Sequence, residues 1–416
     1  MKAGKNPVAA AAAIKNVRNR THRKEAKVKK NTRRISVILT MTALIAALLT
    51  GCGKKENTKA QTTPTPTAAV GTAEQEADME AVKTRAAELA QTVAVTVGDM
   101  DVTMDTMMMF IYSMENMGAQ YEYYYQLYYG SGFWDMAYDE SGITMRDVYK
   151  GYVMNSAVQY GILYQEALEN GITLSEEEQE ENRNFVDQVF QAISAEELER
   201  AGFTREKLLK TAEMMTYAEK YYNFLIETYG ITEEDVKKEV SRDDYKEYET
   251  EYLYLSTSNY DSEYKLIERT EEETAENRAF MQGLLEQLKN GSTMEEIKTA
   301  NTNLTHTTRT FLADTASVDE AYVEAASVLE NGEYSDVIET KYGYYIIKML
   351  NNDCDASYLA ALDDTYGAKV DEAFAKTYEE LEKKYPQTVN EEAWEQIVLG
   401  QTIIIVDTEG LTAQAE

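Results

Sequence analysis

The sequence has 416 residues, which is long enough for two or three domains with well-developed cores. Its formal net charge is −32, but residues 1–51 hold 12 Lys/Arg and one acidic residue, so residues 52–416 carry a net charge of −43. A body of that charge repels phosphate backbones, which argues against nucleic-acid binding.

The N-terminal segment has the order of a secretory signal. Residues 1–34 are basic, residues 35–49 form a short apolar run, and small residues follow. The apolar run is too short to span a bilayer comfortably. The tetrapeptide LTGC that ends at Cys52 resembles the bacterial lipobox, which implies that Cys52 is lipidated and becomes the first mature residue. The alternative is an uncleaved N-terminal anchor.

We therefore assign residues 1–51 to a lipoprotein signal peptide and residues 52–88 to the lipidated Cys52 and a flexible tether rich in Thr, Pro, Ala and Gly. If Cys52 is lipidated, Cys354 has no partner for an intramolecular disulfide. Two distant cysteines also exclude a zinc knuckle or a Cys-x-x-Cys redox pair. No P-loop or EF-hand pattern occurs, and we expect neither a metal nor a cofactor.

Helical patterns dominate residues 89–245. An alternating strand and a turn at Gly98 come first, and a helix is expected to begin near Thr103. Three signals then mark helix boundaries: Gly171 as a stop, Ser175 with Glu178 as a capping box, and Thr204 with Gly230 around a further helix. We predict a helical domain with one N-terminal strand.

The hydrophobic period changes near Tyr248, and residues 246–352 follow the order β-α-α-(β)-α-β-β. This order predicts a small domain with an antiparallel sheet and flanking helices, so the fold class is α+β. Residues 353–416 are expected to form a helix over 355–385 and a final strand in GQTIIIVD, and to pack on the helical domain.

Several motifs carry a family resemblance. Residues 325–350, AASVLENGEYSDVIETKYGYYIIKML, resemble the parvulin-type peptidyl-prolyl isomerase domain, in which Gly332, Ser335, Asp336 and Gly343 match the usual pattern. The segments VAVTVGDMDVTMDTM, LYQEALENGITLSEEEQEE and GITEEDVKKEV resemble the helical chaperone domain of the extracytoplasmic foldase lipoproteins of Gram-positive bacteria. The resemblance implies a folding factor on the outer face of the cytoplasmic membrane, with unfolded secreted polypeptides as partners.

The resemblance also implies a site with two histidines on adjacent strands. The second falls at Tyr345, and the first falls at Tyr252, or at Glu251 if the register slips by one residue. Asn303 is the nearest counterpart of the family's acidic residue. Because His306 is the sole histidine after the signal segment, no histidine pair can form, and we interpret His306 as a solvated loop residue.

Two positions of the prolyl pocket keep apolar or aromatic character, Val318 and Tyr322, and Phe311 is nearby. All three are candidates for substrate binding. A dry pocket that favours the twisted amide can in principle isomerise X-Pro bonds without a nucleophile or a metal. Two functions therefore stay open: a parvulin-type isomerase, or a non-catalytic holdase in which the tyrosines fill a vestigial site as core. A solute-binding lipoprotein would need two similar α/β lobes, which the pattern does not contain.

A second candidate site is the aromatic stretch YEYYYQLYYGSGFW, residues 121–134. Its rings are too dense for one helical face, so some are expected to be exposed and to bind apolar clients. The candidates are Tyr124, Tyr128 and Trp134. The alternative is that these rings form an ordinary helix core.

Overall fold

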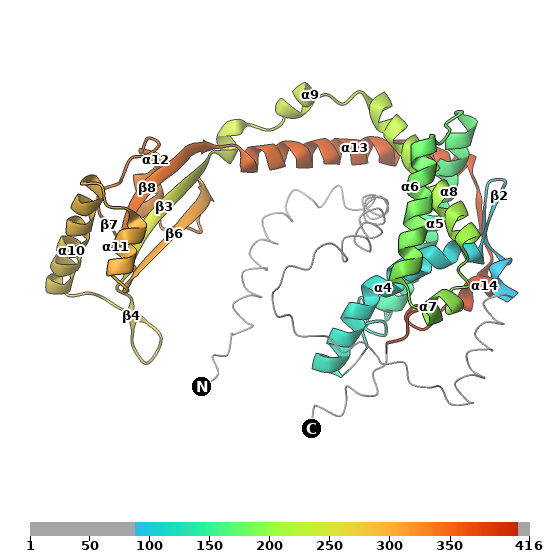
Figure 1. Ribbon diagram of the computed structural model, residues 1–416, viewed down its shortest axis with the longest axis horizontal. Coiled ribbons are helices and arrows are strands. Elements are labelled where there is room, and N and C mark those ends of the chain that lie inside the picture. Colours follow the sequence, from blue (N-terminus) through green and yellow to red (C-terminus); the bar gives the residue numbers. More distant parts are fainter. Residues whose placement is uncertain (1–87, 131, 407–416) are drawn as a thin grey trace. The chain divides into compact units, whose positions relative to one another are not determined.

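The computed structural model describes residues 88–130 and 132–406 (Figure 1). The predicted signal peptide, the lipidated Cys52 and most of the tether lie outside the described residues. The described residues divide into two compact units, one formed by residues 88–130 and 132–229 with 371–406 and the other by Gly230–Val370. The helix α13, Ala356–Lys384, contributes residues to both units.

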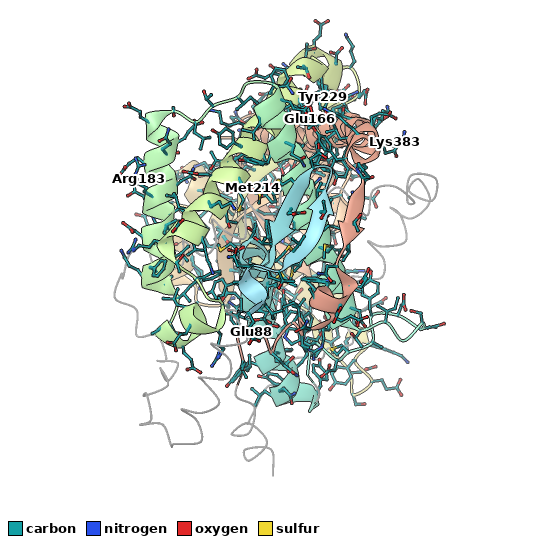
Figure 2. All side chains as sticks on the ribbon, turned by 90° about the vertical axis from the view of Figure 1, so that its right-hand side faces the viewer. Glu88, Glu166, Arg183, Met214, Tyr229 and Lys383 are labelled. Carbon is teal, nitrogen blue, oxygen red and sulfur yellow. The ribbon has the colours of Figure 1, made fainter. Side chains whose placement is uncertain are left out.

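The first unit is mainly helical. Its elements are β1 (Val93–Val97), β2 (Met100–Thr103), α4 (Met104–Tyr129), α5 (Met145–Glu169), α6 (Glu176–Ala192), α7 (Ala195–Arg200), α8 (Arg205–Tyr229), β9 (Gln387–Val389) and α14 (Glu391–Glu395). Figure 2 shows its side chains, with Met214 among the helices and Arg183 at the outer edge. The helical character predicted for this region is confirmed.

The helix boundaries follow local signals in the sequence. Ser175 and Glu178 form the predicted capping box, in which the Glu178 backbone N–H donates to the Ser175 hydroxyl at 3.2 Å and the Glu178 carboxylate accepts from the Ser175 N–H at 2.7 Å. Gly171, just beyond α5, has φ 70°, a left-handed conformation that glycine adopts without steric cost.

The small sheet of the first unit has three antiparallel strands rather than one. Its order is β2-β1-β9, with β1 paired to both neighbours. The single predicted strand is therefore corrected to a hairpin that turns at Gly98, where φ is 58°. β9 pairs with β1 although it lies almost 300 residues further along the chain. A strand of three residues that is stabilised by such a distant partner has no recognisable pattern in its own sequence.

The prediction of a strand in GQTIIIVD is wrong. Residues 401–406 form bends and irregular structure, and their backbone is satisfied by a side chain instead of a neighbouring strand. The buried carboxylate of Glu115 on α4 accepts the backbone N–H groups of four residues at 2.7–3.0 Å: Gly400, Thr402, Ile403 and Ile404. Arg200 also donates to the carbonyl of Ile403 at 2.7 Å. These contacts hold the C-terminal segment against the first unit.

The second unit contains the antiparallel sheet that the sequence predicts. Its elements are α9 (Glu233–Lys237), the 3₁₀ helix η3 (Arg242–Tyr245), β3 (Glu247–Ser256), β4 (Asn259–Tyr260), β5 (Leu266–Ile267), α10 (Glu271–Lys289), α11 (Met294–Ala300), β6 (Leu304–Leu312), α12 (Glu320–Ser327), β7 (Ile338–Thr340), β8 (Gly343–Cys354) and the first part of α13. The main sheet has the order β6-β3-β8-β7, with every neighbouring pair antiparallel. The predicted α+β class is confirmed.

The two faces of this sheet carry separate apolar cores because side chains alternate along each strand. On one face, Leu253 and Ile346 pack with α10 and α11. On the other face, Tyr252 and Ile347 pack with Tyr322 of α12. The α12 face is the one that bears the candidate site.

His306 is not the solvated loop residue that the sequence analysis expected. It lies in β6, and its imidazole forms hydrogen bonds with Glu251 at 2.7 Å and Glu295 at 2.9 Å. The side chain is only 15% exposed. The Thr-rich segment around it is a strand because it pairs with β3 along its full length.

Candidate functional site

Aromatic side chains from four elements meet on the α12 face of the sheet. β3 contributes Tyr252 and Tyr254, β8 contributes Tyr345, β6 contributes Phe311 and α12 contributes Tyr322. The period-2 alternation of the strands sends these residues to the same face. We call these five residues the aromatic floor.

The rings of the aromatic floor contact one another directly. The centroid of Tyr345 lies 5.5 Å from that of Tyr252, 5.1 Å from that of Tyr322 and 4.4 Å from that of Tyr254. Tyr252 and Tyr322 are buried, whereas Tyr345 is half-buried. The structure thus brings together the two tyrosines predicted from the histidine positions. Glu251, the alternative to Tyr252, points to the opposite face and binds His306.

Arg309 lies on the aromatic floor, and the sequence analysis did not identify it. Its guanidinium carbon is 5.0 Å from the ring centroids of both Tyr252 and Tyr322, and Nη2 donates to the Tyr252 hydroxyl at 3.4 Å. A signal was present, because Arg309 precedes Phe311 by two residues in an alternating strand and so shares its face.

Two buried hydroxyls support this arrangement from below. The Thr250 hydroxyl lies 2.8 Å from the Tyr322 hydroxyl and donates to the backbone carbonyl of Arg309 at 3.1 Å. Thr250 is fully buried, so these polar groups are satisfied within the core. They fix the ring of Tyr322 and the backbone that carries the guanidinium.

An open cleft of about 1520 Å³ lies above the aromatic floor. Tyr345 and Arg309 line it, as does Val318, which the sequence analysis predicted for the prolyl pocket. The remaining lining residues are Arg269, Arg278, Ala313, Asp314, Thr315, Ala316, Ser317, Asp319, Glu320, Val323, Glu324, Ser327, Glu339, Thr340, Lys341 and Tyr342. Phe311 and Tyr322 lie beneath this surface in the buried core.

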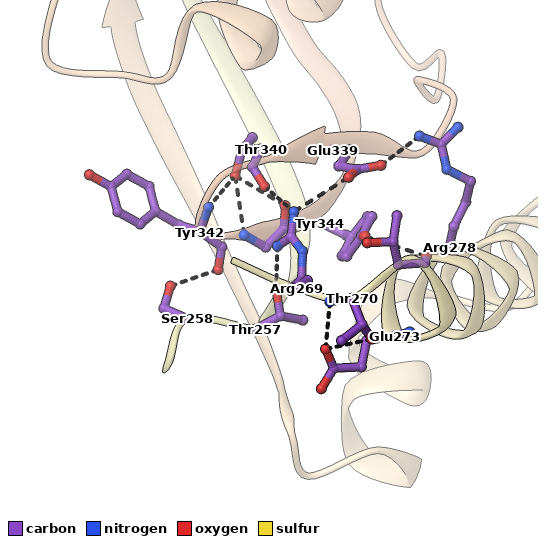
Figure 3. Close-up of polar contacts among 12 residues, drawn as sticks. Thr257, Ser258, Arg269, Thr270, Glu273, Arg278, Glu339, Thr340, Tyr342 and Tyr344 are labelled. Atoms are coloured by element: carbon purple, nitrogen blue, oxygen red, sulfur yellow. Dashed lines mark hydrogen bonds and ion pairs between the residues drawn. The ribbon is translucent and has the colours of Figure 1, made fainter. Parts of the chain in front are cut away.

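One wall of the cleft is held by a carboxylate between two arginines. Glu339 accepts from Arg269 at 3.4 Å and from Arg278 at 2.6 Å (Figure 3). Arg269 also donates to the backbone carbonyl of Thr340 at 2.7 Å. Thr340 in turn accepts the Gly343 N–H at 3.2 Å, so this network fixes the turn between β7 and β8.

Tyr345 and Tyr322 are neutral hydrogen-bonding groups at physiological pH. Burial raises the pKa of Tyr345, and the neighbouring Tyr254 acts in the same direction, while Arg309 opposes them. Burial likewise raises the pKa of Tyr322 far above its ordinary value, against the effect of the Thr250 hydrogen bond. A phenol of this kind can donate and accept hydrogen bonds but does not serve as a general base near neutral pH.

Asn303 is not part of this site. It lies on the exposed turn before β6, outside the residues that line the cleft. The tyrosines meet because strand pairing places them in register, with Tyr252 opposite Ile347 and Tyr254 opposite Tyr345. Asn303 precedes the first paired residue of β6, Leu304, which lies opposite Leu255 at the end of β3.

The second candidate site divides into exposed and buried rings. Tyr124 and Tyr128 on α4 are 48% and 65% exposed, with their ring centroids 4.6 Å apart. Trp134, predicted with them, is only 3% exposed. It is buried because Gly118 and Gly400 lack side chains where its indole ring lies, so Trp134 is a core residue.

Two further observations concern residues 88–130 and 132–406. No group of three or more His, Cys, Asp or Glu side chains there is arranged to hold a metal ion. Within the same residues, no helix has both the length and the apolar character needed to cross a membrane.

Comparison with known proteins finds one family match, and it falls within the second unit. Residues 246–352 match the model of the PPIC-type peptidyl-prolyl isomerase (PPIase) domain. A search of curated proteins finds no significant match to the chain.

The solved structures that this chain matches have low sequence identity to it and low TM-scores. PrsA from Bacillus subtilis is 15% identical, with 67% of this chain and 97% of that chain covered and a TM-score of 0.20. The foldase protein PrsA from Streptococcus pneumoniae is 19% identical (66% and 90% covered, TM-score 0.18). A structure reported for two SurA-like chaperones of Campylobacter jejuni, PEB4 and Cj1289, is 12% identical (72% and 98% covered, TM-score 0.25).

Proposed function

We propose that this chain, which carries a PPIC-type peptidyl-prolyl isomerase domain in residues 246–352, is an extracytoplasmic folding factor that binds unfolded secreted polypeptides. The observation that carries the proposal is the open cleft of that domain, with a half-buried tyrosine and a guanidinium at its base. An unfolded segment offers apolar side chains, proline rings and unpaired backbone groups, and the cleft presents complementary surfaces for each.

Tyr345 is the central contact in this proposal. Its ring lines the cleft and rests on Tyr254 and Tyr322, so a proline or apolar side chain placed on it would be held against a rigid aromatic surface. Its neutral hydroxyl and the N–H groups of Arg309 supply hydrogen-bond donors for a client carbonyl. Isomerisation of an X-Pro bond must overcome a barrier of about 18–20 kcal/mol, and donors that bind the twisted amide lower it.

Holding without catalysis is the second candidate function. It is supported by the packing of the aromatic floor, in which Tyr252 and Tyr322 are buried and burial raises the pKa of Tyr322 far above its ordinary value. In this mode the second unit acts as a peptide clamp, and the exposed Tyr124 and Tyr128 of α4 offer a further apolar surface to the client.

A protease-coupled assay on a proline tetrapeptide distinguishes the two modes. The full chain is compared with its Tyr345→Phe and Tyr252→Phe variants. Acceleration that falls in these variants supports an isomerase in which tyrosines replace the histidine pair. No acceleration, together with suppressed aggregation of an unfolded client, supports the clamp. If the chain neither accelerates isomerisation nor suppresses aggregation, the proposed function is refuted.

We also propose that Cys52 anchors the protein to the outer face of the cytoplasmic membrane. The basic residues 1–34, the apolar run and the LTGC tetrapeptide support this location. Labelling cells with an alkyne fatty acid is expected to mark the wild-type protein and not its Cys52→Ser variant. Equal labelling of both would contradict the anchor, and a Cys354→Ser control should be labelled like the wild type.

A further inference from the structure

Building on the proposed function, we propose that Arg309 makes the cleft selective for client segments in which a carboxylate, such as an Asp or Glu side chain, lies next to the residue seated on Tyr345. Arg309 differs from the other arginines of the cleft in how its charge is compensated. Arg269 and Arg278, the other arginines of the cleft, both form an ion pair with Glu339. In the part of the chain that the structure describes, no carboxylate forms an ion pair with Arg309.

The surroundings of Arg309 explain how an unpaired charge is tolerated there. The faces of Tyr252 and Tyr322 lie against the guanidinium, and their π electrons stabilise the cation. These contacts use the face of the guanidinium. Its N–H groups point along its edge. The hydrogen bond to the Tyr252 hydroxyl is long, at 3.4 Å, and with the contact to the Tyr345 hydroxyl it occupies only part of the guanidinium's set of donors. Donor capacity is therefore left for a ligand.

The chemistry of the guanidinium selects the ligand. Its planar fork of donors matches the two oxygens of a carboxylate, and such pairs form stronger hydrogen bonds than a neutral amide does. Partial burial against two rings removes water that would otherwise compete for these donors. A carboxylate that reaches Arg309 also compensates a cation that the described residues leave unpaired.

Because the protein itself is acidic, an acidic client segment is not attracted from a distance. We expect the preference for a carboxylate to arise only from its direct contact with Arg309. Residues 52–416 carry a net charge of −43, and four acidic residues also line the cleft: Asp314, Asp319, Glu320 and Glu324. Distant acids disfavour the approach of an acidic peptide. At 0.15 M salt, where the Debye length is about 8 Å, that repulsion is largely screened and the local contact decides affinity.

The test compares two fluorescent peptides that differ in one isosteric residue, Ala-Glu-Pro-Phe and Ala-Gln-Pro-Phe, both capped at each end. Binding to the purified full chain is measured by fluorescence anisotropy at 0.15 M salt. We expect the Glu peptide to bind about tenfold more tightly than the Gln peptide. In Arg309→Met the ratio of the two affinities should fall from about tenfold to about one, while both peptides share any loss that comes from the missing donors to the client backbone.

A matched control makes the same chemical change elsewhere. Arg183→Met removes an exposed arginine of α6, outside the second unit, and should retain the tenfold preference. Equal binding of the two peptides to the wild-type chain would overturn the selectivity and leave the proposed function standing. No binding of either peptide would overturn the proposed function as well. If Arg309→Met does not fold, as judged by circular dichroism, the wild-type comparison alone decides.

Discussion

At the level of single residues, the chemistry of the cleft is set by groups that keep one protonation state near neutral pH. The phenols of Tyr345 and Tyr322 stay protonated because burial raises their pKa, and Arg309 contributes a guanidinium. The histidine of this domain, His306, lies on the opposite face of the sheet. Recognition in the cleft therefore depends on shape and fixed charge.

This leads to a prediction about pH. The affinity of the uncharged Gln peptide should vary by less than about twofold between about pH 6 and about pH 8.5, since a raised pKa keeps Tyr345 neutral as the pH increases through this range. Anisotropy titrations at several pH values check it. A sigmoidal change centred near neutral pH would show that a titrating group takes part in binding.

A second prediction concerns the buried hydroxyl pair. Tyr322→Phe removes the hydrogen bond to Thr250 and should lower the free energy of unfolding by about 1 kcal/mol, because Thr250 keeps its bond to the carbonyl of Arg309. Urea denaturation measures the change. Tyr342→Phe, on the 40% exposed ring at the rim, should cost less than about 0.5 kcal/mol. Equal losses in both variants would contradict a specific role for the Thr250–Tyr322 pair.

The sequence predicted part of this site. Tyr252, Tyr345, Phe311, Val318 and Tyr322 could be identified because a motif resemblance assigns positions to a known domain. Arg309 could not be found in this way, since it occupies no motif position and becomes significant only when strand pairing places it over the tyrosine rings. Trp134 shows the converse: its aromatic character suggested a binding surface, but two glycines distant from it in sequence create the space that buries it.

At the level of secondary structure, the helices were predictable because residues close to each helix end determine its boundary. Thr103, Ser175 and Gly230 mark helix ends through backbone and side-chain preferences that need no tertiary contact. The last segment of the chain behaves differently. Its apolar run IIIV has the composition of a strand, but its N–H groups are taken by Glu115, which lies 285 or more positions away.

Glu115 yields the clearest prediction at this scale. Burial raises its pKa, and the four backbone N–H donors oppose that shift. Glu115→Gln keeps the size of the side chain, but it replaces one acceptor oxygen by an NH₂ donor, and two backbone N–H groups then lose their acceptor. The substitution should therefore lower the free energy of unfolding by roughly 2–4 kcal/mol. Limited proteolysis should also cleave the C-terminal segment faster. Glu392→Gln, an exposed carboxylate, is the control, and a loss no larger than that of the control would contradict the anchoring role.

At the level of the whole molecule, the two units offer different surfaces for the same task. The second unit has a cleft with a cationic, aromatic base, and the first unit exposes Tyr124 and Tyr128 beside a methionine-rich core. Apolar and proline-containing segments are both common in unfolded chains. The net charge of −43 for residues 52–416 keeps such a protein soluble while its aromatic surfaces remain available.

The most direct test of the account is the aggregation of an unfolded client. A secreted protein denatured in guanidinium is diluted into buffer with increasing amounts of the full chain, and light scattering is recorded, with serum albumin at equal mass as the control. The account predicts that scattering falls in proportion to the added chain and by at least about half near equimolar ratio, and that Tyr345→Ala weakens this effect. Scattering that matches the albumin control at every ratio would contradict the central claim that the chain binds unfolded polypeptides.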